Sequence, residues 1–218
     1  PTASKDPYGL RRLALGIIRI IHENELLLSI DTLIDAGLKA HGFAKKDALK
    51  HALTHFIKDR LETYLRNIFD IHHVRATLSD TWNGKITQLV HKLNALKSFI
   101  ESPRGEEFLM VYERTANILK DQKSTSSLDK KSMGPEEKDL LATIEAIEKK
   151  IQPLLSLPIP NYTQIIKTVT GLSAPLTVFF NNVMVMDADP VKKNNRLQVL
   201  HRVYTLCAHI CDIQKLAS

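Results

Sequence analysis

Cationic and amide side chains at helical spacing carry the clearest chemical signal in this chain. Arg114, Asn117 and Lys120 recur at intervals of three residues, which places them along one edge of a helix, and Lys123 follows them. A guanidinium can hold a phosphate or a guanine through two parallel hydrogen bonds, and an asparagine amide can pair with a base edge. These four residues are therefore candidate RNA contacts. The alternative is an ordinary solvated helix face, which the spacing taken alone favours.

A second basic group lies at residues 192–196, where an Asp-Pro pair predicts the start of the last helix. Lysines near the N-terminus of a helix oppose its dipole, and each one is unfavourable by a few tenths of a kcal/mol. A locally unfavourable choice indicates a role outside the helix. We therefore predict that Lys192, Lys193 and Asn195 contact RNA.

Arg196 ends this basic group and has two acidic residues upstream, Asp187 and Asp189. An ion pair with either carboxylate would fix the loop before the helix, and we favour this structural role for Arg196 over RNA contact. The preceding apolar run at 178–186 carries paired Phe residues and two Met residues. Such a run is more typical of a packed helix end than of a ligand site.

Side chains that could perform catalysis are scarce. The chain has neither a glycine-rich phosphate loop nor a serine nucleophile elbow. His51 and His55 have the spacing of a zinc-protease helix, but Ala52 stands where such a site needs glutamate. Cys207 and Cys211 lie one helical turn apart, where a disulfide is geometrically poor, so we predict reduced, buried thiols. We predict no catalytic, cofactor-binding or metal-binding residue.

Charge and composition permit several kinds of partner. The 218 residues include 30 Lys and Arg against 24 Asp and Glu, which gives a net charge of +6 and a pI of about 9.3. A mildly basic chain can bind a polyanion but does not require one. The sequence shows no signal peptide and no apolar run of about 20 residues, so we expect a cytoplasmic protein without a membrane partner. The missing initial Met indicates a piece of a longer protein.

The elements that must position these residues are helices. Only 8 glycines occur, and 44% of the residues are hydrophobic, in long runs without the alternation typical of strands. We predict an all-α multi-helix bundle of nine or ten helices, with a helical body at 1–70 and a larger helical domain at 71–218. The helix at 10–21 is apolar on nearly all sides, so we expect it to be buried.

Three segments resemble a known family. The first 20 residues, PTASKDPYGLRRLALGIIRI, resemble the segment that follows the HD-like domain in the β subunit of bacterial heterotetrameric glycyl-tRNA synthetase. YERTANILK at 112–120 resembles another segment of that subunit. VFFNNVMVM at 178–186, with NRLQVL at 195–200, resembles the anticodon-binding domain named for its Asp-Ala-Leu-Arg (DALR) motif, which arginyl-tRNA synthetases share. Gln-Ile-Ile at 164–166 replaces the first three residues of that motif.

The resemblance implies a DALR-like anticodon-binding domain at 71–218 and a place in glycine–tRNA ligase. In that enzyme an α subunit holds glycine, ATP and Mg and performs adenylation, and the β subunit binds glycine tRNA. The chain would grip the anticodon stem-loop, without DNA binding, cofactor or catalytic residue of its own. Two alternatives stay open: a helical scaffold for subunit assembly without anticodon reading, and a stand-alone metal enzyme that uses His51 and His55.

Overall fold

The computed structural model describes residues 6, 8–43, 47–78, 82–120, 122, 128–212 and 215–216. Across these residues it contains ten α-helices, two short 3-10 helices and one isolated β-bridge, between Ser29 and Lys85. The predicted all-α class is therefore confirmed. The chain divides into two compact units, Pro1–Leu93 and Asn94–Ser218.

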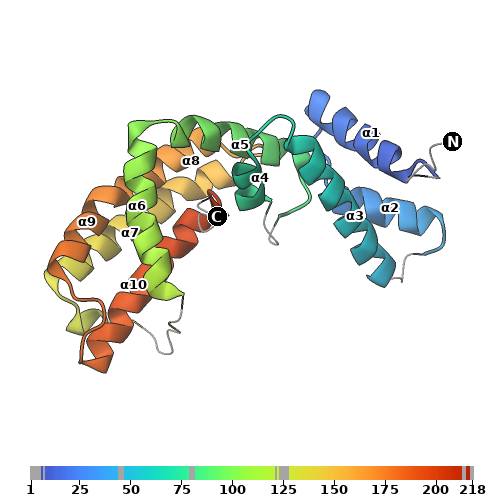
Figure 1. Ribbon diagram of the computed structural model, residues 1–218. Helices are drawn as coiled ribbons and strands as arrows, with labels where there is room; N and C mark the ends of the chain where they lie inside the picture. The colour runs from blue at the N-terminus through green and yellow to red at the C-terminus, as the bar shows by residue number, and fades with distance from the viewer. Residues whose placement is uncertain are drawn as a thin grey trace. The chain divides into compact units, whose positions relative to one another are not determined.

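The first unit contains α1 (Leu10–Glu23), α2 (Ile30–Ala40), α3 (Asp47–Leu65), α4 (Ile71–Thr77) and the first half of α5 (Ile86–Ile100). Helices α1, α2 and α4 all pack against α3 (Figure 1). Their apolar faces meet in one core whose most deeply buried members come from every helix of the unit: Ile18, Ile30, Leu61, Leu65, Val74, Ile86 and Leu93. This shared core explains why the five segments form one unit.

The boundary between the units lies further along the chain than we predicted. We placed the end of the helical body at residue 70. The structure instead keeps α4 and the first half of α5 in the first unit. Val74 and Ile86 are fully buried in its core, and the Thr87 hydroxyl donates a 2.7 Å hydrogen bond to the carbonyl of Leu26. Long-range packing of the segments around the turn therefore decides the boundary.

Helix α1 is buried on one side only, whereas we expected it to be buried all round. Ala14, Ile18 and Ile21 face the core. Four of its other large apolar residues, which we call the α1 stripe, are 41–63% exposed: Leu10, Leu13, Ile17 and Ile20. The expectation failed because an apolar helix surface shows that burial is favourable, but not whether a neighbour within the same unit covers it.

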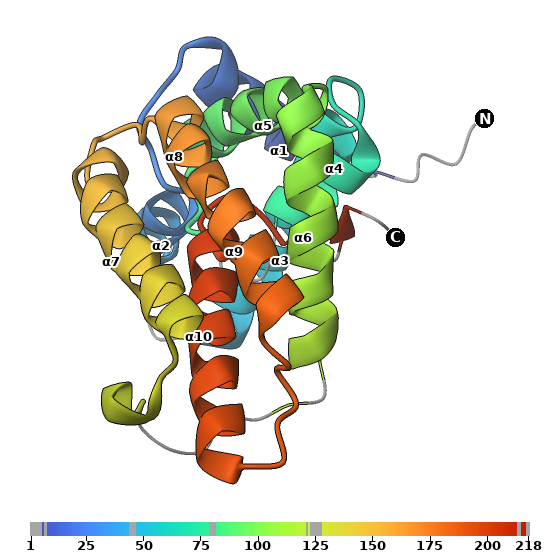
Figure 2. The same cartoon turned by 90° about the vertical axis from the view of Figure 1, so that its left-hand side faces the viewer.

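The second unit contains the rest of α5 and seven further helical elements: α6 (Pro103–Leu119), α7 (Pro135–Leu155), α8 (Tyr162–Val169), α9 (Ser173–Asn182), α10 (Pro190–Ala208) and the 3-10 turns η1 (Lys130–Ser132) and η2 (Thr170–Leu172). Helix α10 lies between α6 and α7, and α9 packs against both of these helices (Figure 2). The predicted burial of the two cysteine thiols is confirmed, since Cys207 and Cys211 are at most 2% exposed. Among the described residues, neither of these cysteines forms a disulfide, and burial raises the pKa of the Cys207 thiol.

Gly105 allows the first turn of α6 to approach the end of α5. A Cβ atom at this position would lie 2.3 Å from the carbonyl oxygen of Phe99. We expect Gly105→Ala to lower the free energy of unfolding by about 1–3 kcal/mol, the range for overpacked sites. Gly171→Ala is the matched control, since nothing lies within 4 Å of its Cβ position. It should stabilise the chain by about 0.4–1 kcal/mol. Thermal denaturation measures both, and equal melting temperatures would contradict the prediction.

Candidate nucleic-acid interface

Helix α6 presents the first predicted group to solvent. Its start is set by Ser102, whose hydroxyl accepts a 3.2 Å hydrogen bond from the backbone N–H of Gly105. Arg114, Asn117 and Lys120 are all exposed. At about 100° per residue, Arg114 and Lys120 are about 120° apart around the helix, with Asn117 between them. They therefore cover a broad exposed face of α6 rather than a narrow edge.

The Arg114 guanidinium is held above an aromatic ring. Its central carbon lies 4.4 Å from the ring centroid of Phe180, which belongs to α9. A cation–π contact of this kind contributes about 0.5–1 kcal/mol at a partly exposed site and limits the motion of the guanidinium. Among the residues that the structure describes, no carboxylate pairs with Arg114. Its N–H donors therefore have no protein anion competing with an RNA phosphate.

Lys120 follows the last residue of α6 and borders α10. It lines a pocket of about 250 Å³ together with Leu119, His201 and Tyr204. One wall of this pocket is packed against the helix interior, because the Tyr204 ring stacks on that of Tyr112 with centroids 5.8 Å apart. The Lys120 amine thus stands beside a fixed part of the helix interface.

The start of α10 presents the two predicted lysines. The Asp189 carboxylate accepts hydrogen bonds from the backbone N–H groups of Val191 (2.8 Å) and Lys192 (3.4 Å). It thereby caps the first turn of α10, whose N–H groups have no acceptor within the helix. Lys192 is exposed and Lys193 is half-buried. The N-terminal end of α10 and the C-terminal end of α6 lie at the same end of the second unit (Figure 2). The structure therefore brings Lys192 and Lys193 to the end of the unit that also carries Lys120.

The prediction that Asn195 contacts RNA is wrong. Its side chain is only 1% exposed, and its polar atoms are engaged within the protein. The side-chain oxygen accepts from the N–H of Asp129 at 2.8 Å, and the amide nitrogen donates to the carbonyl of Asp129 (2.9 Å) and to the Ser132 hydroxyl (2.8 Å). The amide supplies hydrogen-bond partners to a segment 66 residues away, a contact that local spacing cannot reveal.

The structural role that we predicted for Arg196 is confirmed, with Asp187 as the partner. The Arg196 Nη1 donates to Asp187 Oδ2 at 2.6 Å and to the carbonyl of Met184 at 2.8 Å. Its Nε donates to Glu137 Oε1 at 2.5 Å. We call Arg196, Glu137 and Asp187 the Arg196 network. It links the segment before α10 to the first turn of α7, and so holds the end of α10 that carries the two lysines.

Sequence reasoning missed Glu137, the most buried member of this network at 2% exposed. Its second carboxylate oxygen accepts a 3.0 Å hydrogen bond from the backbone N–H of Gly134. A glutamate three residues after a helix cap is the pattern of a capping box, and that signal was present in Gly134-Pro135-Glu136-Glu137. The capping pattern identifies the local bond but gives no indication of the distant Arg196.

The remaining predicted residues give no second site of this kind. Lys123 lies outside the described residues. His51 and His55 are exposed on α3, and His55 lies 3.4 Å from the carboxylate of Asp59. Within the described ranges, no three His, Cys, Asp or Glu side chains are grouped closely enough to share a metal ion. In the same ranges, none of the helices is both long and apolar enough to cross a bilayer.

Comparisons with known proteins point to one family for both parts of the chain. Residues 1–79 match the model of the glycyl-tRNA synthetase β subunit, and residues 108–215 match that of the DALR anticodon binding domain. The glycine–tRNA ligase β subunits of Rickettsia canadensis and Rickettsia akari are each 36% identical to the chain over 217 residues, and that of Rickettsia bellii is 34% identical.

These alignments cover 99% of the chain but only 31–32% of each relative. The chain thus spans about a third of the length of the curated relatives that it matches. The exposed cations of α6 and α10 lie inside the segment that matches an anticodon-binding domain. By these matches and its all-helical fold, the chain belongs to the glycyl-tRNA synthetase β-subunit family.

Proposed function

We propose that this chain is the part of a glycine–tRNA ligase β subunit that binds the anticodon stem-loop of glycine tRNA during aminoacylation. The observation that carries the proposal is the exposed face of α6, where Arg114, Asn117 and Lys120 stand within the segment that matches a DALR anticodon binding domain. In this proposal the α subunit of a cytoplasmic heterotetramer holds ATP and Mg and performs the chemistry. The present chain supplies RNA affinity and selectivity.

The side chains at this end of the unit suit a structured RNA hairpin. Arg114, Lys120 and Lys192 can each neutralise a backbone phosphate and release its bound counterions, which drives association and makes it sensitive to salt. Asn117 lies between two of these cations on the same helix face, where its amide can pair with the edge of an unstacked base. The cations would then position the RNA, and the amide would contribute to the choice of sequence.

Titration of the chain with glycine tRNA tests the proposal directly. We expect saturable binding that weakens as salt rises, with a logarithmic slope of about 0.7–0.9 for each phosphate contact. Exchange of a single anticodon cytosine should weaken binding by about 1–3 kcal/mol if bases are read through their edges. The control is a tRNA with the same body and an exchange in the acceptor stem. Equal affinity for all three RNAs at moderate salt would contradict anticodon reading.

A second candidate function is subunit assembly without anticodon reading, and the α1 stripe favours it. Four exposed apolar side chains on one face of a helix are typical of a surface covered by another protein segment. If assembly is the function, Leu13→Asp with Ile17→Asp in the intact synthetase should reduce the complex to free subunits in a size measurement. Charge reversal on α6 would then leave tRNA binding unchanged. If the α1 variant dissociates but charge reversal on α6 also weakens tRNA binding, the proposed RNA-binding function stands.

A further inference from the structure

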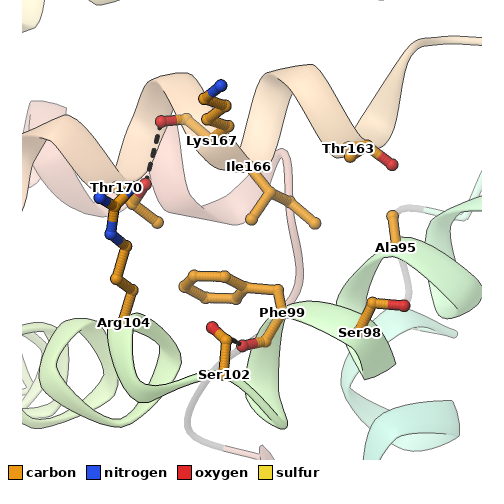
Figure 3. A pocket seen from close by; sticks show the side chains of 9 residues that line it. All are labelled: Ala95, Ser98, Phe99, Ser102, Arg104, Thr163, Ile166, Lys167 and Thr170. Carbon is orange, nitrogen blue, oxygen red and sulfur yellow. Dashed lines mark hydrogen bonds between the residues drawn. The ribbon is translucent and has the colours of Figure 1, made fainter.

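A pocket in the second unit lies away from the cations described above. It has a volume of about 220 Å³ and lies between α8 on one side and the junction of α5 and α6 on the other (Figure 3). Its apolar walls are formed by the Phe99 ring and by Ile166, which points toward that ring from α8. Arg104 stands at one end, and Thr163 stands at the other (Figure 3). The result is an apolar slot with polar ends.

The walls of the slot are fixed by bonds that do not use its interior. The Ser102 hydroxyl donates to the carbonyl of Phe99 at 2.6 Å, and the Thr170 hydroxyl donates to the carbonyl of Lys167 at 2.9 Å. The Phe99 ring meets the ring of Phe108 edge-on, with centroids 5.7 Å apart. The slot is therefore a formed feature of the unit and does not depend on a ligand to shape it.

Two cations from distant parts of the sequence line this slot. Arg104 belongs to α6 and Lys167 to α8, and both also line a neighbouring pocket of about 340 Å³. Both side chains are exposed, and across the described ranges neither has an ion pair or a hydrogen-bond partner for its charged group. Lys167 extends along the outer side of α8, and Arg104 reaches toward Thr170 (Figure 3). The acidic Glu107 lines only the neighbouring pocket.

This combination selects a class of ligand. A bare anion would leave the apolar walls unused, and an apolar ligand would leave both cations unused. A nucleotide satisfies both features, because a base is flat and apolar on its faces and carries its phosphate at one end. Unstacked bases of single-stranded RNA are commonly held against aromatic side chains with cations beside their phosphates.

We propose that this slot holds one unstacked nucleotide of the bound RNA, with its base between Phe99 and Ile166 and its phosphate beside Arg104. The inference rests on the proposed function, because it names a second place where the same RNA is held. Arg104 precedes Arg114 by ten residues on α6, so the two contacts lie about 15 Å apart along the helix axis. One hairpin can thus engage both contacts at once.

The test compares two variants, in each of which two cationic side chains are replaced by glutamate. Arg104→Glu with Lys167→Glu removes the cations of the slot, and Lys149→Glu with Lys150→Glu makes the same charge change on the exposed side of α7. Binding of a labelled glycine anticodon stem-loop is measured against salt for both variants. We expect the slot variant to lose about tenfold more affinity than the control, with a logarithmic salt slope lower by about 0.7–0.9, since one phosphate contact is removed.

Cytidine 5′-monophosphate provides the second probe, with methyl NMR of the wild-type chain as the readout. We expect the nucleotide to shift the Ile166 methyl signals, and the shift to disappear in the slot variant. Equal RNA affinity in the two variants, or no shift of the Ile166 methyl signals, would overturn the inference about the slot. The proposed function would stand in that case as long as the wild-type chain binds tRNA. A wild-type chain that bound no RNA would refute the proposed function, and the nucleotide shift would still decide whether the slot is a nucleotide site.

Discussion

Replacement of Arg114 and Lys120 by glutamate is expected to weaken binding of glycine tRNA by about 100- to 1,000-fold at 0.15 M salt. The two substitutions change the local charge by four units, and each phosphate contact contributes a logarithmic salt dependence of about 0.7–0.9. Arg114→Glu also removes the cation above the Phe180 ring. Fluorescence anisotropy with labelled tRNA, repeated over a range of salt concentrations, measures both the affinity and the slope.

The control for this experiment is a variant with the same net charge as the reversed α6 variant. Lys149→Glu with Lys150→Glu alters two exposed lysines of α7, a helix that carries none of the predicted RNA-binding residues, and should change affinity severalfold at most. Arg114→Lys is a useful intermediate, because it keeps the charge and loses the forked pair of hydrogen bonds. A reversed α6 variant that binds as tightly as the α7 control would refute the proposed interface and favour the scaffold function.

Replacement of Arg196 by methionine is expected to lower the free energy of unfolding by roughly 3 kcal/mol, the lower end of the range for a broken buried ion pair. The substitution leaves the Glu137 carboxylate, which is 2% exposed, without its cation. It also frees Asp187 and the carbonyl of Met184. The expected loss lies at the lower end because the Arg196 side chain keeps 13% of its surface exposed. Urea denaturation of the variant and the wild type measures the difference.

Arg202 offers a matched control on the same helix. It pairs with Glu148 and Glu145 of α7, but about a third of its side chain is exposed, so Arg202→Met should lower stability by at most about 1 kcal/mol. A similar loss for both variants would show that burial does not distinguish the two ion pairs. The Arg196 variant should in addition lose tRNA affinity where it still folds, because the lysines at the start of α10 lose their fixed position.

The dependence of the free energy of unfolding on pH, at acidic pH, gives an independent test of the Arg196 network. Hydrogen bonds from the backbone N–H of Asp189 and then from Arg196 lower the pKa of Asp187. Its carboxylate therefore contributes stability above its unfolded pKa of about 3.9, and this contribution is lost as pH falls through the lower folded value. Because Arg196→Met removes both the hydrogen bond and the charge of Arg196, the stability of this variant should fall less steeply than that of the wild type below about pH 4. An identical decrease in the stability of both proteins at acidic pH would count against the network.

The sequence by itself determined the local elements of this protein. Helices predominate because long apolar runs at three- and four-residue spacing contain few breakers, and Pro103, Asn161 and Asp189 mark helix starts where the structure has them. The exposure of Arg114, Asn117 and Lys120 also follows from the periodicity of α6, because one face of that helix is apolar and the opposite face is polar.

Tertiary structure decided which faces and side chains remain available. Asn195 has the composition of a surface residue, yet the backbone of Asp129 takes up its amide. The α1 stripe has the composition of a core, yet its own unit leaves it exposed. Arg104 and Lys167 carry no signal in sequence, and they line one pocket only because α8 lies beside the junction of α5 and α6. In each case, whether the side chain is engaged or exposed depends on a partner more than 60 residues away, or on the lack of a partner within the unit. The periodicity of a single helix carries no information about such partners.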